Sequence, residues 1–147
     1  MQEHVQRFDC RKPSAPVRRM RTSFTLLVLI GTLIAACDGT ASDTGIAPQD
    51  PNMVEEGETL FADNCAACHG EDVRGTNQGP SLLSEVYVPS HHSDGSFLLA
   101  VQNGSPAHHW DFGNMPPIEG LTPEDVEAIV AYVREQQRIN GFESYPP

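Results

Sequence analysis

Positive charge is scarce beyond the first quarter of the sequence, and this scarcity excludes several classes of function. Six of the nine basic residues precede Cys37, whereas only two of the twenty acidic residues do. From Cys37 onward, three arginines therefore face eighteen acidic residues, and lysine is absent. Such a surface repels phosphate backbones and anionic lipid headgroups. We expect no nucleic-acid partner.

Long hydrophobic runs are also missing. The most apolar stretch, residues 24–36, has 13 uncharged residues, whereas a helix needs about 20 to cross a bilayer. Arginines precede this stretch and small residues end it, which is the pattern of a secretory signal. Its last residues, Ile34-Ala35-Ala36-Cys37, resemble the bacterial lipobox, in which the chain is cut before a cysteine that carries lipid. We predict that residues 1–36 are a signal region and that Cys37 anchors the protein to the extracytoplasmic face of the membrane, in the periplasm, through its acyl chains. An uncleaved or ordinarily cleaved signal is the alternative.

The N-terminal region contains a second possible translation start and a predicted linker. Counted from Met20, the signal up to Cys37 has 18 residues, and residues 1–19 then lie ahead of the true start. Residues 37–51 contain much Asp, Thr, Gly and Pro, which is typical of a flexible tether. We assign residues 52–147 to a single small domain, since this length does not suffice for two.

Only four cysteines are present, and two of them form a motif. Cys10 falls in the signal region, and Cys37 is assigned to lipid. The other two stand in a Cys-x-x-Cys-His pattern made by Cys65, Cys68 and His69, which is the attachment motif of c-type haem. One helical turn presents both thiols and the imidazole to the same porphyrin. The motif predicts one covalent haem c with iron, and no cysteine remains for a disulfide framework.

Two other interpretations of the cysteine pair stay open. A zinc site needs four ligands, so histidine pairs elsewhere in the chain would have to supply the missing ones. A thioredoxin-like redox pair needs a strand before it and a long helix after it, whereas Gly70, Gly75 and Gly79 make the following segment a loop. The export signal favours haem, because it directs the chain to the compartment where c-type haem is attached.

Residues 52–138 resemble a class I cytochrome c. Gly57 and Phe61 match the family's Gly-x-x-x-aromatic pattern, and Val54, Gly57, Phe61 and Cys65 recur at helical spacings of three and four. The glycine costs about 1 kcal/mol of helix propensity, which a close helix crossing would justify. In the family, this glycine meets the C-terminal helix. The resemblance implies an all-α cytochrome c fold, with helices and loops wrapped around one haem.

Caps and periodicity predict two further helices. Ser93 caps the middle helix, which ends at Gly104. The last helix has Thr122 as its N-cap, Pro123 in its first position and Asp125 close to a capping-box position, and Gly141 stops it. The last helix carries an apolar stripe, a tyrosine beside it, and arginines that suit the helix dipole in its final turns: Val126, Ile129, Val130, Val133, Tyr132, Arg134 and Arg138.

The resemblance also implies roles for individual residues around the haem. The carbonyl of Pro80 would accept a hydrogen bond from His69 Nδ1–H, which leaves Nε2 for iron. Leu82 and Leu83 would line the proximal haem face. Met115, in a Gly-x-Met-Pro-Pro pattern, occupies the family's distal position, where its thioether raises the reduction potential.

Alternatives to these roles remain. Met115 would otherwise fill a gap in the core, and a histidine would then be the distal ligand. Trp110 is our preferred donor to a haem propionate, ahead of its histidine neighbours. Two histidine pairs are candidates for haem ligation, for a second metal such as copper or zinc, or for ordinary solvated loops: His91, His92, His108 and His109.

These observations predict a monomeric one-electron carrier rather than an enzyme. The acidic surface would select redox partners with a basic docking surface, unless it serves only solubility or adaptation to salt. Two alternatives remain. One is a fixed electron-transfer subunit of an oxidase or dehydrogenase complex, and the other is a haem-based ligand sensor in which Met115 is not a ligand.

Overall fold

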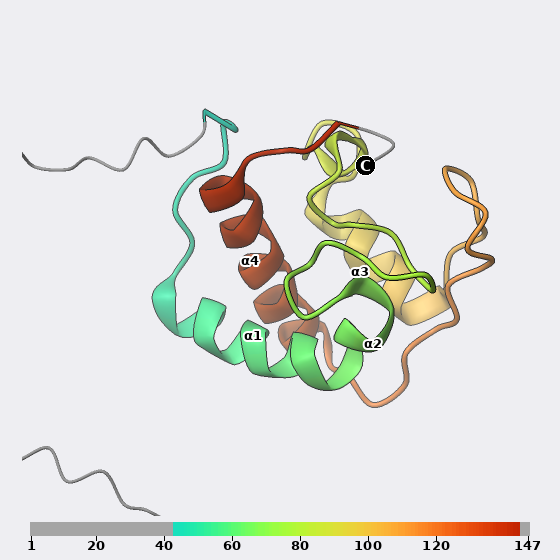
Figure 1. Cartoon of the computed structure of the whole chain (residues 1–147). Helices are drawn as coiled ribbons and strands as arrows, with labels where there is room; N and C mark the ends of the chain where they lie inside the picture. The colour runs from blue at the N-terminus through green and yellow to red at the C-terminus, as the bar shows by residue number, and fades with distance from the viewer. Residues whose placement is uncertain (1–42, 145–147) are drawn as a thin grey trace, which may run out of the picture. The chain divides into compact units, whose positions relative to one another are not determined.

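The computed structural model describes residues 43–144. The helices are α1 (Pro51–Asn64), α2 (Ala66–His69), α3 (Asp94–Asn103) and α4 (Pro123–Asn140), with a 3-10 turn, η1 (Glu85–Tyr87), in the loop between α2 and α3 (Figure 1). No β-strand occurs within residues 43–144, so the predicted all-α class is confirmed. The predictions for residues 1–36, Met20 and Cys37 lie outside the described residues.

Helix α1 begins at a side-chain cap. Asp50 Oδ1 accepts hydrogen bonds from the backbone N–H groups of Asn52 (2.8 Å) and Met53 (3.3 Å), which satisfies donors that the first helical turn leaves unpaired. Pro51 is the first residue of the helix, although the sequence placed it in the linker. Just before the cap, the backbone N–H of Gln49 lies 3.4 Å from Glu135 Oε2 on α4.

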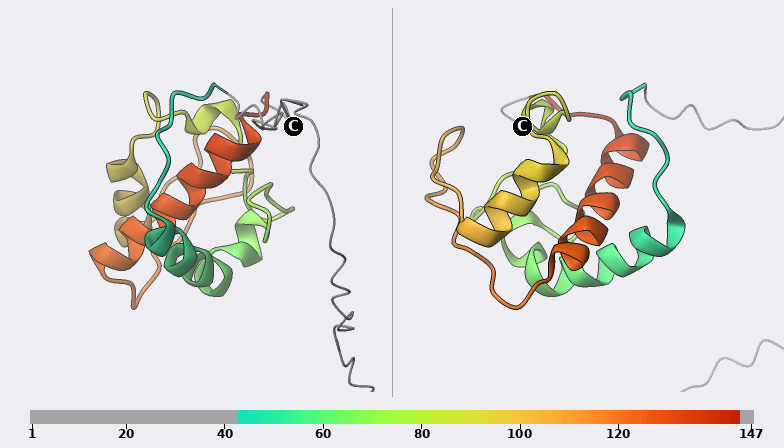
Figure 2. Two further views of the ribbon diagram at one scale, coloured as in Figure 1. Left: turned by 90° about the vertical axis from the view of Figure 1, so that its left-hand side faces the viewer. Right: turned by 180° about the vertical axis from the view of Figure 1, so that it is seen from behind.

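Helices α1 and α4 cross in contact, as the glycine pattern predicted (Figures 1 and 2). A Cβ at Gly57 would stand 1.9 Å from the carbonyl oxygen of Ala128 on α4, so only glycine fits at this crossing. One turn further along α1, the Phe61 ring packs on Tyr132 with ring centres 5.3 Å apart. The crossing therefore holds the end of α1, and with it the start of α2, against the most buried part of α4.

Helix α4 has the ends that its sequence predicts. Thr122 Oγ1 accepts from the backbone N–H of Asp125 at 3.2 Å, and Asp125 Oδ2 accepts from the backbone N–H of Thr122 at 2.8 Å, which completes a capping box. Gly141 is the C-cap. The apolar stripe and Tyr132 are all buried. The predicted stripe is confirmed.

Arg134 is a buried residue of α4. The sequence predicted that Arg134 and Arg138 both suit the dipole in the final turns of the helix, but only Arg138 lies in the last turn, and the Arg134 side chain is 3% exposed. Its guanidinium bonds to Asp94 Oδ1, the Tyr87 carbonyl and Gln137 Oε1, each at 2.8 Å. These partners neutralise the charge and occupy its donors, which is what permits burial of an arginine.

Helix α3 spans the predicted residues but starts differently. Ser93 is the N-cap, as expected, although its side chain makes no capping bond. Instead, the hydroxyl of Ser96 donates to the Ser93 carbonyl at 2.5 Å. The helix ends at Gly104 and packs on α4, where Val101 joins Val126 and Val130 in a second apolar cluster.

Loops complete the fold between the helices. Leu83 has no exposed surface and packs in the main core. It is not among the residues that line the cavity described below, in contrast to our prediction. Across the part of the chain that the structure describes, no helix is both long enough and apolar enough to cross a membrane.

Candidate functional site

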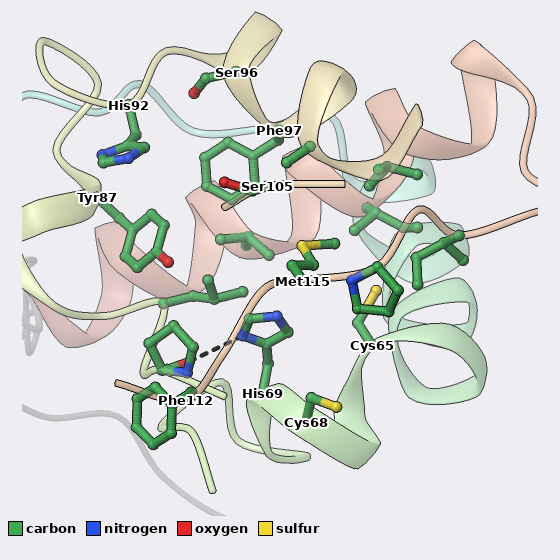
Figure 3. Close-up of a pocket in the computed structure, with 18 of the residues that line it drawn as sticks. Cys65, Cys68, His69, Tyr87, His92, Ser96, Phe97, Ser105, Phe112 and Met115 are labelled. Carbon is green, nitrogen blue, oxygen red and sulfur yellow. Dashed lines mark hydrogen bonds between the residues drawn. The ribbon is translucent and has the colours of Figure 1, made fainter. Parts of the chain in front are cut away.

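A cavity of about 350 Å³ opens between α2, α3, α4 and the loop that joins the last two helices. This volume lies in the usual range for ligand and cofactor sites. Figure 3 shows residues from the Cys-x-x-Cys-His turn and from the loop before α4 around the same space. Much of its lining is apolar and includes Phe61, Leu82, Phe97, Val101, Ile129 and Val133.

The Cys-x-x-Cys-His motif occupies the turn between α1 and α2. Cys65 separates the two helices, and its N–H donates to the Phe61 carbonyl at 2.8 Å. Its own carbonyl accepts from the N–H groups of Cys68 (3.1 Å) and His69 (2.9 Å). Both thiols are free, and both cysteines and His69 line the cavity. One tight turn thus directs two thiols and an imidazole to one site, which fits a covalently attached planar cofactor.

The His69 ring is held in one tautomer. Its Nδ1 lies 3.0 Å from the carbonyl oxygen of Pro80 (dashed line in Figure 3). A carbonyl only accepts, so Nδ1 carries the hydrogen and Nε2 of the neutral ring keeps its lone pair. Burial lowers the pKa of His69, while the bond to Pro80 acts in the opposite direction. The hydrogen bond implied by the resemblance is present, and it prepares Nε2 to bind a metal.

Burial also determines the protonation state of Cys65, the first cysteine of the motif. It raises the pKa of the Cys65 thiol to about 11, with a smaller contribution from the neighbouring Cys68. The thiol therefore stays protonated at neutral pH, the form with the lowest tendency to oxidise or to bind stray metal ions.

Met115 lies on a segment that is pinned to the end of α3. Its N–H donates to the Ser105 carbonyl at 2.9 Å, and its carbonyl accepts from the Ser105 N–H at 3.0 Å. A further bond of 2.8 Å joins the Ile118 N–H to the Val101 carbonyl. The Met115 side chain lines the same cavity as His69 (Figure 3). Of the two methionines in the described residues, Met53 and Met115, it is Met115 that lines the cavity.

Aromatic residues extend the cavity away from the cysteines. Trp110 lines it and stacks on Tyr87, with ring centres 5.8 Å apart and an interplanar angle of 11°. Burial raises the pKa of Tyr87 to about 12. Phe112 also lines the cavity and is 41% exposed. Sequence reasoning missed Tyr87 and Phe112, since neither belongs to a motif or a periodic segment.

The two histidine pairs, far apart in the sequence, meet in space. Ring centres of His91 and His109 are 5.2 Å apart, and those of His92 and His108 are 5.8 Å apart. Burial, together with nearby imidazoles, lowers the pKa values of His92 and His109. His92, His108 and His109 line the cavity. The sequence singled out both pairs but contained no signal that they form one cluster.

The site has the features of a single-haem, c-type cytochrome: two thiols and a carbonyl-bonded imidazole on one turn, beside an apolar cavity enclosed by helices. The sequence profile described as "Cytochrome c" matches residues 54–137. The chain belongs to the cytochrome c family, and the predicted family and all-α cytochrome c fold are confirmed.

Individual relatives agree with this assignment. The chain is 37% identical over 87 residues to the Cbb3-type cytochrome c oxidase subunit CcoP of Rubrivivax gelatinosus, which covers 58% of this chain and 26% of the relative. It is 27% identical over 118 residues to Cytochrome c-551 of Bacillus subtilis, which covers 76% of this chain and 94% of the relative. The chain thus spans about a quarter of the length of the oxidase subunit.

Among solved structures, the chain is similar to cytochrome cL of Methylophaga aminisulfidivorans. The sequence identity is 25%, the TM-score is 0.48, and the match covers 67% of this chain and 71% of the other. Family membership implies one covalent haem c, with Cys65 and Cys68 fitting its attachment site. A domain of this family transfers electrons through its haem.

Proposed function

We propose that this protein is a membrane-tethered one-electron carrier with an iron ligated by His69 and Met115. Cys65 and Cys68 would form the two thioether bonds to the haem. The observation that carries the proposal is the pairing of two candidate ligands in one cavity: a His69 ring oriented by the Pro80 carbonyl at 3.0 Å, and a Met115 side chain on a segment fixed to α3.

The chain's own residues tune the electron transfer. When bound, haem supplies a ferric–ferrous couple that takes up one electron at a time. Met115 offers a neutral, soft sulfur that favours the reduced state and so raises the potential. Pro116 and Pro117 restrict the loop that carries it. Because Met115 would take up the distal position, it would also exclude external ligands such as dioxygen or carbon monoxide.

Two further residues have proposed positions around the ring. Leu82, 6% exposed and lining the cavity, would contact the proximal face. Trp110 would donate its indole N–H to a propionate, a role supported by its position in the cavity and its stacking on Tyr87. Neutral donors of this kind suit a domain with only three arginines beyond Cys37.

The absorption spectrum of the holoprotein tests the ligand set. Met115→Ala should abolish the near-infrared sulfur-to-iron charge-transfer band and allow carbon monoxide to bind the reduced protein. Met53→Ala is the matched control, because Met53 is an exposed methionine on α1 and should leave both properties unchanged. A band that survives in Met115→Ala would assign the distal position to another residue. Rapid carbon monoxide binding by the parent protein would favour the alternative function, a haem-based ligand sensor in which Met115 does not ligate iron.

The proposed tether rests on Cys37, which ends the lipobox-like sequence Ile34-Ala35-Ala36-Cys37. The signal-like residues 1–36 would direct the chain across the membrane, and lipid on Cys37 would retain it at the extracytoplasmic face. Cys37→Ser should move the protein from the membrane fraction to the soluble periplasmic fraction, whereas Cys10→Ser should not. Mass spectrometry of the mature N-terminus would show the acyl chains. Membrane retention of Cys37→Ser would contradict the proposal.

A fixed subunit of an oxidase is the second candidate function. Its support is the similarity to an oxidase subunit over 58% of this chain. A shuttle should purify as a monomer without a stoichiometric partner after mild detergent extraction. Comigration with one multisubunit complex through native electrophoresis would favour the fixed subunit instead.

A further inference from the structure

Four histidines from two loops gather at one end of the cavity. His91 and His92 follow η1, and His108 and His109 lie in the loop between α3 and α4. Ring centres within the cluster are 4.6 Å apart for His91 and His92, and 4.3 Å apart for His108 and His109. In the view of Figure 3, His92 lies beside Tyr87, away from the cysteines. The cluster is therefore separate from the attachment turn.

Backbone carbonyls fix the orientation of three of these rings. The Val86 carbonyl lies 2.9 Å from His91 Nδ1 and 2.7 Å from His92 Nδ1. The Pro106 carbonyl lies 2.8 Å from His108 Nδ1. Each Nδ1 must carry the hydrogen, because a carbonyl cannot donate, so each neutral ring keeps its lone pair on Nε2. Metal-binding histidines are commonly oriented by such a bond from the other ring nitrogen.

We propose that His91, His92 and His109 form a binding site for one divalent transition-metal ion, Zn²⁺ or Cu²⁺, that is distinct from the haem iron. One nitrogen from each of the three rings lies within 4.8 Å of the others. Imidazole is a preferred ligand of both ions. Three ligands leave a further position for water.

The geometry is close to that of a bound ion. Zinc–nitrogen bonds of about 2.0–2.1 Å in a tetrahedral site place ligand nitrogens roughly 3.4 Å apart. The nitrogens of the three rings lie within 4.8 Å of one another. Each pair must therefore move closer together by no more than about 1.4 Å, and small side-chain rotations suffice for this. His91 is exposed and His109 is partly exposed, so their rings have room to move and an ion can reach them from solvent.

Electrostatics also favour a cation at this position. Arg134 is the nearby positive charge, through its bond to the His92 carbonyl, and Asp94 accepts from the same guanidinium at 2.8 Å. Eighteen acidic residues against three arginines beyond Cys37 create a negative potential that concentrates cations around the domain.

The experiment uses the holoprotein after treatment with a chelator. Calorimetric titration with Zn²⁺ should show one site per chain, and His91→Ala or His109→Ala should each weaken it at least about tenfold, since loss of a residue hydrogen-bonded to a metal ligand already costs that much. His108→Ala is the matched control, because His108 belongs to the cluster but not to the group of three and its Nδ1 bonds to the Pro106 carbonyl rather than to a proposed ligand, so it should weaken binding less than either of those variants. With Cu²⁺, electron paramagnetic resonance should show hyperfine coupling to imidazole nitrogen.

Three results would overturn this assignment: no stoichiometric Zn²⁺ binding, equal affinity in the parent protein and His91→Ala, or a Cu²⁺ spectrum without imidazole nitrogen. The near-infrared haem band, recorded in the same samples, separates this inference from the proposed function. Loss of that band on adding Zn²⁺ would show that the ion displaces Met115 from iron, which would also overturn a site distinct from the haem iron. Circular dichroism of each variant confirms that the fold is intact.

Discussion

Arg134 on α4 donates a hydrogen bond of 2.5 Å from Nη2 to the carbonyl oxygen of His92. The same guanidinium donates to the Tyr87 carbonyl at 2.8 Å. Its Cζ atom lies 5.0 Å from the centre of the Phe97 ring. One buried arginine therefore holds the loop that carries His91 and His92 to the C-terminal helix. The position of the histidine cluster depends on a residue that binds neither haem nor the proposed metal.

Arg134→Met should destabilise the fold substantially. The variant leaves the carbonyls of Tyr87 and His92 without their donor, and each lost partner of a buried polar group costs about 1–3 kcal/mol. We expect a loss of about 2–4 kcal/mol in the free energy of unfolding, measured with denaturant. Arg138→Met on the same helix is the control, because Arg138 bonds to the Glu135 carboxylate rather than to buried backbone carbonyls and should cost less. Comparable losses in the two variants would contradict the role of the backbone contacts.

Gly57→Ala should force helices α1 and α4 apart at the point where they cross. The added Cβ would lie 1.9 Å from the Ala128 carbonyl oxygen, so one helix must shift, and we expect a loss of about 2–3 kcal/mol or more, as for overpacked cores. Gly95→Ala in α3 is the control, since its nearest neighbour is 4.0 Å away and alanine is the better helix former. Thermal unfolding of both holoproteins measures the difference. Equal melting temperatures would show that the crossing tolerates a methyl group.

The free energy of unfolding should depend on pH because of the ionisation of the Glu135 carboxyl group. Its carboxylate accepts from Arg138 Nε at 2.8 Å and Nη2 at 2.6 Å, and this bonding lowers the pKa of Glu135 below its ordinary value of 4.5. A lowered folded-state pKa contributes stability that is present above the unfolded pKa and is lost as the pH falls through the folded pKa.

Glu135→Gln should therefore be less stable than the parent at pH 7, and the difference should shrink as the pH falls below about 4. Denaturant unfolding at several pH values measures it. Glu127→Gln, on an exposed part of the same helix, controls for the change in helix charge. A constant difference between pH 7 and pH 3 would contradict the proposed effect of ionisation.

Electron exchange should respond to salt in opposite directions for oppositely charged reagents. With a net charge of about −15 beyond Cys37, oxidation of the reduced protein by a tripositive cobalt complex should slow as ionic strength rises, because salt screens attraction. Oxidation by hexacyanoferrate(III) should accelerate. Stopped-flow absorbance at the haem bands measures both rates. Insensitivity to salt would argue against a basic docking surface on the natural partner.

Much of the helical framework was predictable because its signals are local. The Thr122–Asp125 capping box, the stop at Gly141 and the Gly104 terminus each depend on neighbours within a few residues, so the sequence contains all the information. The Gly57 crossing and the bond from His69 to Pro80 were also expected, through the resemblance to class I cytochromes c. Both features are present.

By itself, then, the sequence determined the all-α class, the cytochrome c family and the composition of the haem-attachment turn, since these follow from short-range spacing and caps. Only the tertiary structure decided the burial of Arg134, the placement of Leu83 in the core and the meeting of His91 and His92 with His109. Each of these depends on how long loops close over α4. Loop closure is governed by contacts between residues far apart in the chain, which leave no periodic or motif-like trace in the sequence.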